Sequence, residues 1–300
     1  MFISNDLESE SGEGLTFGQL ARTLGRTFFV RDVMVPLKQI KSVAHGDEAR
    51  AASIISELRY SVVPISKDEM SFEAVYYPES RGTKESAKIQ RASISLADHI
   101  PDSTSLAEAF PLFREREWYL TFRANRVSGL ITYWAFNSRE FCVQLFAALS
   151  RVEELSKDVL EGDGKGISDE SGLVFDEPLP RRIVKNFKKT LAKNGGNRFV
   201  DALGFSHVSQ ALAHDQTWRE FLDQRASSEM SDQNYKQRYG FVDLRNAVMH
   251  GGTPFPDYEL FKQRSIDIYH IGELIDYLDA YRKCQEAARA DNRNGGSPTP

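Results

Sequence analysis

The chain has 300 residues, 41% hydrophobic and 27% charged, so it can form two globular domains and differs from a disordered polypeptide. Its two cysteines, Cys142 and Cys284, exclude a disulfide framework and a cysteine metal cluster. We expect a cytoplasmic protein without membrane contact, because no apolar stretch approaches the roughly 20 residues that span a bilayer and the acidic start differs from an export signal.

The net charge of −5 is unevenly distributed along the chain. From Pro178 onward, 18 Lys and Arg stand against 15 Asp and Glu, a balance of +3, whereas residues 1–177 carry −8. We therefore expect the C-terminal part to be the one that binds a polyanion.

Composition and periodicity predict a multidomain α+β protein, with an α/β region followed by a helical bundle. Both ends of the chain are rich in Gly, Ser, Asn and Pro and lack an apolar period, which predicts disordered tails. A stretch of glycines and carboxylates between them predicts a linker. The predicted segments are a tail at 1–14, an α/β region at 15–138, a long helix at 139–160, a linker at 161–177, a helical domain at 178–289 and a tail at 290–300.

The α/β region contains a weak internal repeat. Asp47 and Asp102 lie 55 residues apart, each at the N-cap position of a predicted helix with the same apolar spacing. A predicted strand follows each helix, at 61–65 and 118–122, and further strands are predicted at 72–77 and 127–133.

Three segments of this region resemble a tandem pair of CBS domains: VRDVMVPL at 30–37, SVVPI at 61–65 and VSGLITYWAFN at 127–137. The resemblance implies an adenosine nucleotide as regulatory ligand, contacted by Thr132. Ala135 stands where the family pattern has an Asp, so the ribose contact is lost and the pocket is weakened, altered or empty. The alternative for Thr132 is a strand-end threonine whose hydroxyl bonds to the backbone.

The predicted long helix begins with Asn137 and Glu140 in a possible capping box. One apolar stripe then runs along it, formed by Phe141, Leu145, Leu149, Val152, Leu155 and Val159. This helix could close the CBS-like pair, dimerise, or serve as the first helix of the C-terminal bundle.

A basic helix is predicted after Pro180. Its apolar face carries Ile183, Phe187 and Leu191, and its cationic face carries Arg182, Lys185, Lys189 and Lys193. Such a row suits the phosphate backbone of RNA, and the alternative is an ordinary solvated face.

The segment FVDLRNAVMHGG at 241–252 predicts a helix that is ended by two glycines. Asn246 and His250 lie one turn apart on its surface, and Arg245 lies beside them, so three polar groups can converge. An imidazole can carry protons, and a guanidinium can hold a phosphate.

These residues resemble the R-x4-6-H motif of the HEPN superfamily, with Arg245, Asn246 and His250 at the matching positions. The resemblance implies a homodimeric helical bundle and a metal-independent endoribonuclease, with no cofactor required for catalysis. In that mechanism the 2′-hydroxyl of RNA attacks the adjacent phosphate while His250 moves protons and Arg245 holds the phosphate. Asn246 orients the phosphate or the histidine. A toxin or defence role would be consistent with such activity.

Two functions therefore stand side by side: a ribonuclease gated by a nucleotide, and a non-catalytic dimeric sensor or RNA-binding scaffold. The burial of His250 separates them, because an imidazole enclosed in its own bundle cannot reach a substrate. The remaining histidines lack the spacing of a zinc site.

Overall fold

The computed structural model describes residues 27–58, 61–68, 71–78, 89–162, 164, 172–194, 198–225 and 241–294. These residues form two units. The sheet unit comprises Ala21–Ala147 and Leu244–Ile266, and the helical unit comprises the described residues of Ala148–Asp243 and those from Asp267 onward. The coarse prediction of N-terminal sheets and a C-terminal helical region is confirmed. Leu244–Ile266 belongs to the sheet unit, whereas the prediction placed these residues in the helical domain at 178–289.

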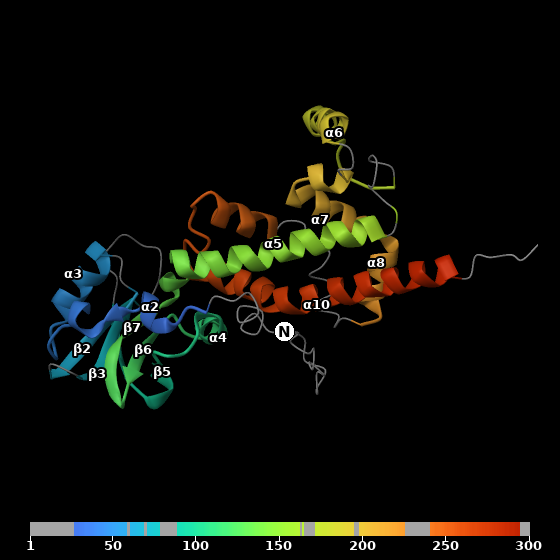
Figure 1. Ribbon diagram of the computed structural model, residues 1–300. Coiled ribbons are helices and arrows are strands. Elements are labelled where there is room, and N and C mark those ends of the chain that lie inside the picture. Colours follow the sequence, from blue (N-terminus) through green and yellow to red (C-terminus); the bar gives the residue numbers. More distant parts are fainter. Residues whose placement is uncertain are drawn as a thin grey trace, which may run out of the picture. The chain divides into compact units, whose positions relative to one another are not determined.

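The predicted repeat is present in the sheet unit (Figure 1). Each copy contains a helical segment followed by an antiparallel hairpin: α3 (Glu48–Leu58) precedes β2 (Val63–Asp68) and β3 (Ser71–Pro78), and α4 (Leu106–Ala109) precedes β6 (Trp118–Arg123) and β7 (Arg126–Thr132). All four predicted strands are therefore confirmed.

Parallel pairing across the helical segment also recurs in both copies. Val43 bridges Ile65 in the first copy, and β5 (His99–Pro101) pairs with β6 in the second, where His99 faces Leu120. The equivalent positions differ by 55 or 56 residues, as the sequence repeat requires.

The first strand of each copy pairs with the hairpin of the other copy. β1 (Val35–Pro36) lies against β7, and β4 (Ile89–Ser93) lies against β3, both antiparallel. The resulting sheets have the orders β1-β7-β6-β5 and β2-β3-β4. The two copies therefore complete one another's sheets.

The second helical segment departs from the prediction at both ends. Asp102 does not cap it, because the Asp102 carboxylate is buried and accepts a hydrogen bond from Arg123 Nε at 2.7 Å. Ser105 is the N-cap instead and forms a capping box with Glu108. The α-helix then changes to the 3₁₀-helix η3 (Phe110–Arg114), where Pro111 supplies no N–H to continue the α-helical pattern.

Two kinds of core hold the sheet unit together. Mainly aliphatic residues pack between α3 and the strands β2 and β3, while a cluster of aromatic rings lies next to η3 and η4 (Tyr133–Asn137). The ring centroids of Phe110 lie 5.0 Å from those of Phe136 and Phe261. Shorter elements of this unit are α2 (Val30–Val33), η1 (Leu37–Gln39) and η2 (Leu96–Asp98).

The predicted long helix is α5 (Arg139–Gly162), and all six residues of its predicted apolar stripe are buried. The predicted cap at Asn137 is wrong, since the hydroxyl of Ser138 accepts from the Phe141 N–H at 3.4 Å. The Asn137 side chain bonds to Phe255 instead.

The helical unit contains α6 (Arg181–Asn194), η5 (Phe199–Ala202), α7 (Phe205–His214), α8 (Gln216–Asp223) and the later part of α10 (Tyr258–Asn294). Trp218 and Phe221 of α8 pack on Tyr281 of α10, with ring centroids 5.5 and 4.9 Å away. Arg198 donates to Asp158 of α5 and to Asp201, each at 2.8 Å, and these hydrogen bonds raise the pKa of its guanidinium.

The segments between and beyond the helices differ in part from the prediction. Residues 172–177 of the predicted linker contain no helix or strand, and residues 290–294, assigned to the C-terminal tail, continue α10 because the preceding alanines favour helix. The predicted tail at 1–14 and residues 295–300 lie outside the described residues. None of the described helices has an apolar stretch that could cross a bilayer.

Candidate functional site

The Arg245 motif lies on a helix over 241–249 that is held by its predicted apolar side. Phe241 and Leu244 are buried, and Val248 is half-buried. The opposite side therefore faces outward, and the exposed Asn246 and His250 lie there.

The three polar residues of the motif are only partly brought together. Arg245 Nη1 donates to Asn246 Oδ1 at 3.4 Å, and the Arg245 side chain is half-buried. His250 is exposed, and its imidazole makes no hydrogen bond or ion pair to any residue that the structure describes. It is thus free to exchange protons with a bound molecule.

Two glycines end this helix in a Schellman motif. Gly252 N–H donates to the Ala247 carbonyl at 2.8 Å, and Gly251, with φ of +67°, occupies the left-handed position that favours glycine. His250 is consequently the C-cap residue. The paired glycines of the sequence thus place the imidazole at the end of the helix.

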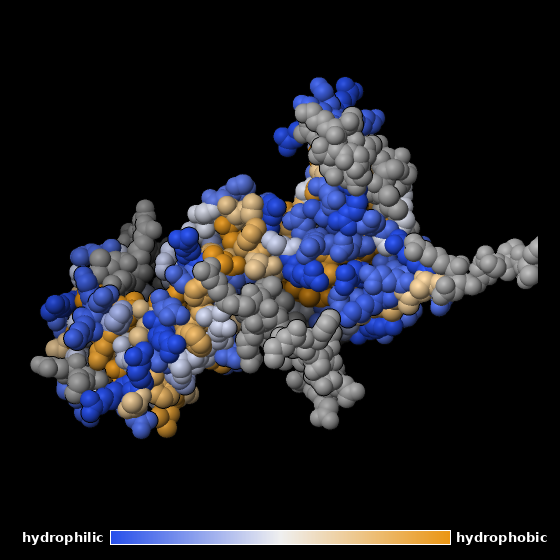
Figure 2. All heavy atoms as spheres, in the orientation of Figure 1, coloured by the Kyte–Doolittle hydropathy of each residue, from blue (hydrophilic) through white to orange (hydrophobic). Residues whose placement is uncertain are grey.

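The predicted cationic face of α6 is exposed. Arg182, Lys185 and Lys189 point to solvent, whereas the side chain of Lys193 lies outside the described residues. The sequence reading missed two further exposed cations of this helix, Arg181 and Lys188. Among the described residues none of these five cations has a carboxylate partner, and Figure 2 shows hydrophilic atoms gathered over α6.

The charge of Arg182 acts on a nearby histidine of α7. The pKa of His207 is lowered, first by burial and then by the positive charge of Arg182. His207 Nδ1 is also buried, without a hydrogen-bond partner among the described residues. The pKa of His207 therefore depends on a positive charge of the basic face of α6.

A cavity of about 550 Å³ lies where β7 ends in the sheet unit, and Thr132 is in its wall. The described wall combines three chemical kinds of group: one cation, two aliphatic hydroxyls and an exposed indole, among mainly apolar side chains. The residues are Lys41, Ser61, Thr132 and Trp134, with Val35, Ile40, Val62, Pro64, Leu130, Tyr133 and Pro256 around them.

The groups in this cavity are available to a ligand. Thr132 is the N-cap of η4, yet its hydroxyl makes no capping hydrogen bond, so the alternative of a hydroxyl satisfied by the backbone does not hold for the described residues. Trp134 is 53% exposed, and Lys41 is the one charged residue among the described residues of the wall. Ala135 is half-buried and lies outside the lining, and the described lining residues include no carboxylate.

Gly129 of the GLIT segment brings one wall of this cavity into place. A Cβ at Gly129 would lie 2.5 Å from the Val35 carbonyl oxygen, so only glycine lets β1 pair with β7 at this point. The pairing carries Val35 to the cavity.

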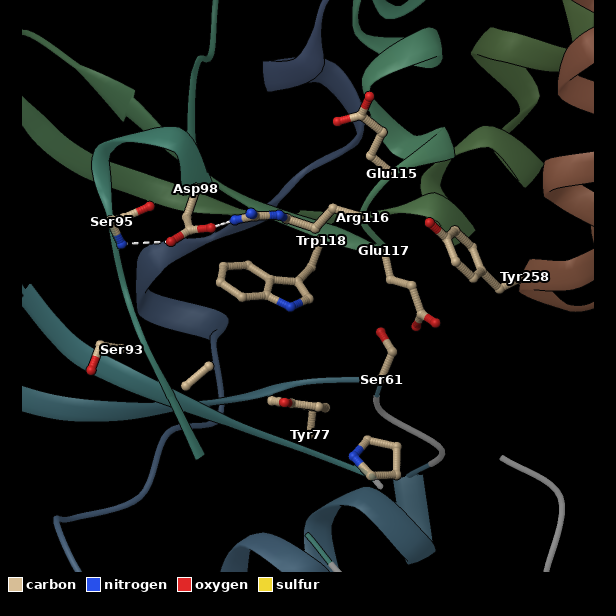
Figure 3. A pocket seen from close by; sticks show the side chains of 12 residues that line it. Ser61, Tyr77, Ser93, Ser95, Asp98, Glu115, Arg116, Glu117, Trp118 and Tyr258 are labelled. Carbon is tan, nitrogen blue, oxygen red and sulfur yellow. Dashed lines mark hydrogen bonds and ion pairs between the residues drawn. The ribbon is translucent and has the colours of Figure 1, made fainter. Parts of the chain in front are cut away.

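A second cavity of about 430 Å³ occupies the repeat-related position in the sheet unit (Figure 3). Tyr77 and Pro78 stand where the 55-residue offset places Thr132 and Tyr133. Arg116 similarly stands in the place of Ser61, and Ser61 itself borders both cavities.

The two cavities differ in charge. In the second cavity, Arg116 forms an ion pair with Asp98, which also accepts from the Ser95 N–H at 2.5 Å. Figure 3 shows Glu117 directed toward Ser61, and Glu115 is a third carboxylate in the lining. Among the described lining residues, one guanidinium against three carboxylates disfavours a phosphate ligand in this cavity, whereas the Thr132 cavity carries a single positive charge.

Comparison with protein-family models and with curated proteins gives no match to this chain. Within the described residues, no three His, Cys, Asp or Glu side chains are placed to hold a metal ion. The sequence reading named only Thr132 at the cavity and missed Lys41, Trp134 and Pro256. The SVVPI segment was a signal for Ser61, but no local pattern marks Pro256, which joins the cavity from far along the chain.

Proposed function

We propose that this protein is a metal-independent endoribonuclease of HEPN type, regulated by a nucleotide that binds a tandem CBS pair. The observation that carries the proposal is the exposed imidazole of His250, one turn after Asn246 on a helix that also presents Arg245. The repeat with exchanged first strands supports the CBS part, and the exposed cations of α6, which have no carboxylate partner among the described residues, support RNA as the polyanion.

In the proposed reaction, the 2′-hydroxyl of RNA attacks the adjacent phosphorus and the bond to the 5′-oxygen of the next nucleotide breaks. The products are a 2′,3′-cyclic phosphate and a free 5′-hydroxyl, so the proton lost by the first oxygen balances the one gained by the second. Arg245 stabilises the charge that develops on the phosphate. A homodimer would supply a second His250, so that one imidazole accepts a proton while the other donates one.

The test uses the purified full chain and end-labelled RNA in EDTA. We expect His250→Ala and Arg245→Ala to lower the cleavage rate by about 10²-fold or more, since acid–base catalysis contributes that much. The matched control is His45→Ala, another exposed histidine, which pairs with Glu73 in the sheet unit. A substrate with 2′-deoxy sugars should stay intact. Equal cleavage by wild type and His250→Ala would remove the enzymatic proposal.

A second candidate is a non-catalytic sensor or RNA-binding scaffold, and the Thr132 cavity favours it. A cation, two hydroxyls and an exposed indole are suited to the phosphate, sugar and base of a nucleotide. The volume of about 550 Å³ lies within the usual range of ligand pockets.

Tryptophan fluorescence tests this binding directly, because Trp118 and Trp218 are buried and Trp134 is exposed. We expect ATP to quench the emission of the wild type and to leave Trp134→Phe unchanged. Lys41→Gln should weaken ATP more than it weakens adenosine, since only ATP carries phosphates. Nucleotide binding without His250-dependent cleavage would select the sensor over the enzyme.

A further inference from the structure

The segment 251–257 connects the motif to the Thr132 cavity within the sheet unit. It starts directly after His250 and ends at Asp257, whose side chain accepts from the Leu260 N–H at 2.8 Å at the start of α10. Pro256 of this segment is part of the cavity wall. Only five residues therefore lie between His250, which bears the exposed imidazole, and Pro256, which a ligand in the cavity would touch.

Asn137 joins this segment to η4, which also borders the cavity. Its Nδ2 donates to the Phe255 carbonyl at 2.9 Å, and its Oδ1 accepts from the Phe255 N–H at 2.8 Å. Asn137 is the last residue of η4, which begins with the cavity residues Tyr133 and Trp134. The amide pair thus ties together two chain segments that both border the cavity.

Within this connection, Phe255 is held by packing, whereas the residues next to His250 are exposed and include two glycines. The Phe255 ring is fully buried, with its centroid 5.2 Å from that of Phe261 and 6.0 Å from that of Phe110. Residues 251–253 are exposed, and the two glycines of the Schellman motif lie between Phe255 and the helix. A displacement of η4 would move Phe255, and the two glycines would then change conformation and carry the displacement to His250.

We propose that Asn137 is a positioning residue through which occupancy of the Thr132 cavity sets the position of His250. This inference rests on the proposed function, and it adds the route of regulation. A ligand that contacts Trp134 and Pro256 moves η4 and the segment together, because Asn137 binds both polar groups of the Phe255 peptide. Coupling between two sites typically changes the affinity at one of them by about 5-fold to 150-fold when the other is occupied.

Hydrogen–deuterium exchange of peptides from 244–257 tests the route, with ATP as the probe. We expect ATP to slow exchange in the wild type about 5-fold or more. The effect should vanish in Asn137→Ala and in Asn137→Asp, which retains the acceptor for Phe255 but loses the donor, while Trp134 fluorescence still reports bound ATP. Arg264→Met is the matched control, since the Arg264 guanidinium also holds this segment by donating to the Pro254 carbonyl.

A second arm needs no ligand. Val35 lies in the cavity wall and is 42% exposed, so Val35→Trp adds an uncharged ring there at little cost to packing. We expect this substitution to change exchange of 251–257 in the wild-type background and to have no such effect combined with Asn137→Ala.

The two arms separate the two proposals. Failure of ATP to bind removes the nucleotide from the proposed function, and Val35→Trp then decides the route alone. The route is overturned when ATP or Val35→Trp acts equally with and without Asn137, or when bound ATP leaves 244–257 unchanged.

Discussion

The carboxamide of Asn137 pairs with both polar groups of the Phe255 peptide, across 118 positions of the chain. Two hydrogen bonds at 2.9 and 2.8 Å from one half-buried side chain give a fixed geometry that a single bond would not. Within the sheet unit this pair anchors the segment that follows the helix over 241–249.

Replacing Asn137 with Ala should lower the free energy of unfolding by about 1–3 kcal/mol, because it leaves a partly buried N–H and carbonyl without a partner. Asn137→Asp should not restore stability, since a carboxylate oxygen would face the Phe255 carbonyl. Urea denaturation of the three proteins provides the measurement. Equal stability of Asn137→Ala and wild type would contradict the importance of the pair.

Replacing Gly129 with Ala should be destabilising by about 1–3 kcal/mol, since the added Cβ meets backbone that cannot move without losing the β1 pairing. Gly204→Ala is the matched control: its Cβ would have no neighbour nearer than 3.8 Å, and its N-cap position costs under about 1 kcal/mol. Thermal unfolding compares both variants. A larger loss at Gly204 than at Gly129 would refute the steric argument.

Replacing Lys185 or Lys189 with Gln should weaken RNA binding equally for unrelated sequences and reduce the slope of log affinity against log salt by about 0.7 for single strands. Each substitution removes one exposed cation that has no carboxylate partner in the described chain. Lys157→Gln is the control, because Lys157 already pairs with Glu153 at 2.9 Å. An unchanged slope for both α6 variants would assign these cations to an ordinary solvated face.

His207 should make the protein sensitive to acid. Its pKa is lowered by burial and by Arg182, so protonation is less favourable in the folded state than in the unfolded chain. Stability is therefore complete above the ordinary pKa of about 6.5 and is lost as pH falls through the lower folded value.

We accordingly expect His207→Gln to lose less melting temperature than wild type between about pH 7 and about pH 5. Arg182→Gln should raise the pKa of His207 in an NMR titration, and Lys189→Gln should change it less. A pKa that does not respond to Arg182 would show that burial alone lowers it.

The sequence predicted those elements whose formation depends on residues close together in the chain. The stripe from Phe141 to Val159 has a helical period over several turns, and the helix it predicts is α5. The hairpin strands combine β-branched and aromatic residues with short turns, and the 55-residue offset recurs in their pairing. The glycines after His250 likewise end their helix as predicted.

Long-range partners explain where the sequence reading was wrong. Asn137 and Asp102 have the residue types of helix caps, but each side chain forms a hydrogen bond with a distant partner, Phe255 or Arg123, and a neighbouring serine caps the helix. Sequence spacing cannot distinguish these two uses of a short polar side chain. The Thr132 cavity was incompletely predicted for the same reason, since Lys41 and Pro256 reach it only through the fold.

The exchange of first strands sets a lower limit on what can fold as an autonomous piece of the sheet region. A fragment ending before Ile89 would retain the β2–β3 hairpin but would leave the outer backbone groups of β3 unsatisfied, while its own β1 would lack β7. Such a fragment could recover both pairings only by associating with a complementary fragment. Although the region contains a repeat, we therefore expect it to fold as one cooperative unit.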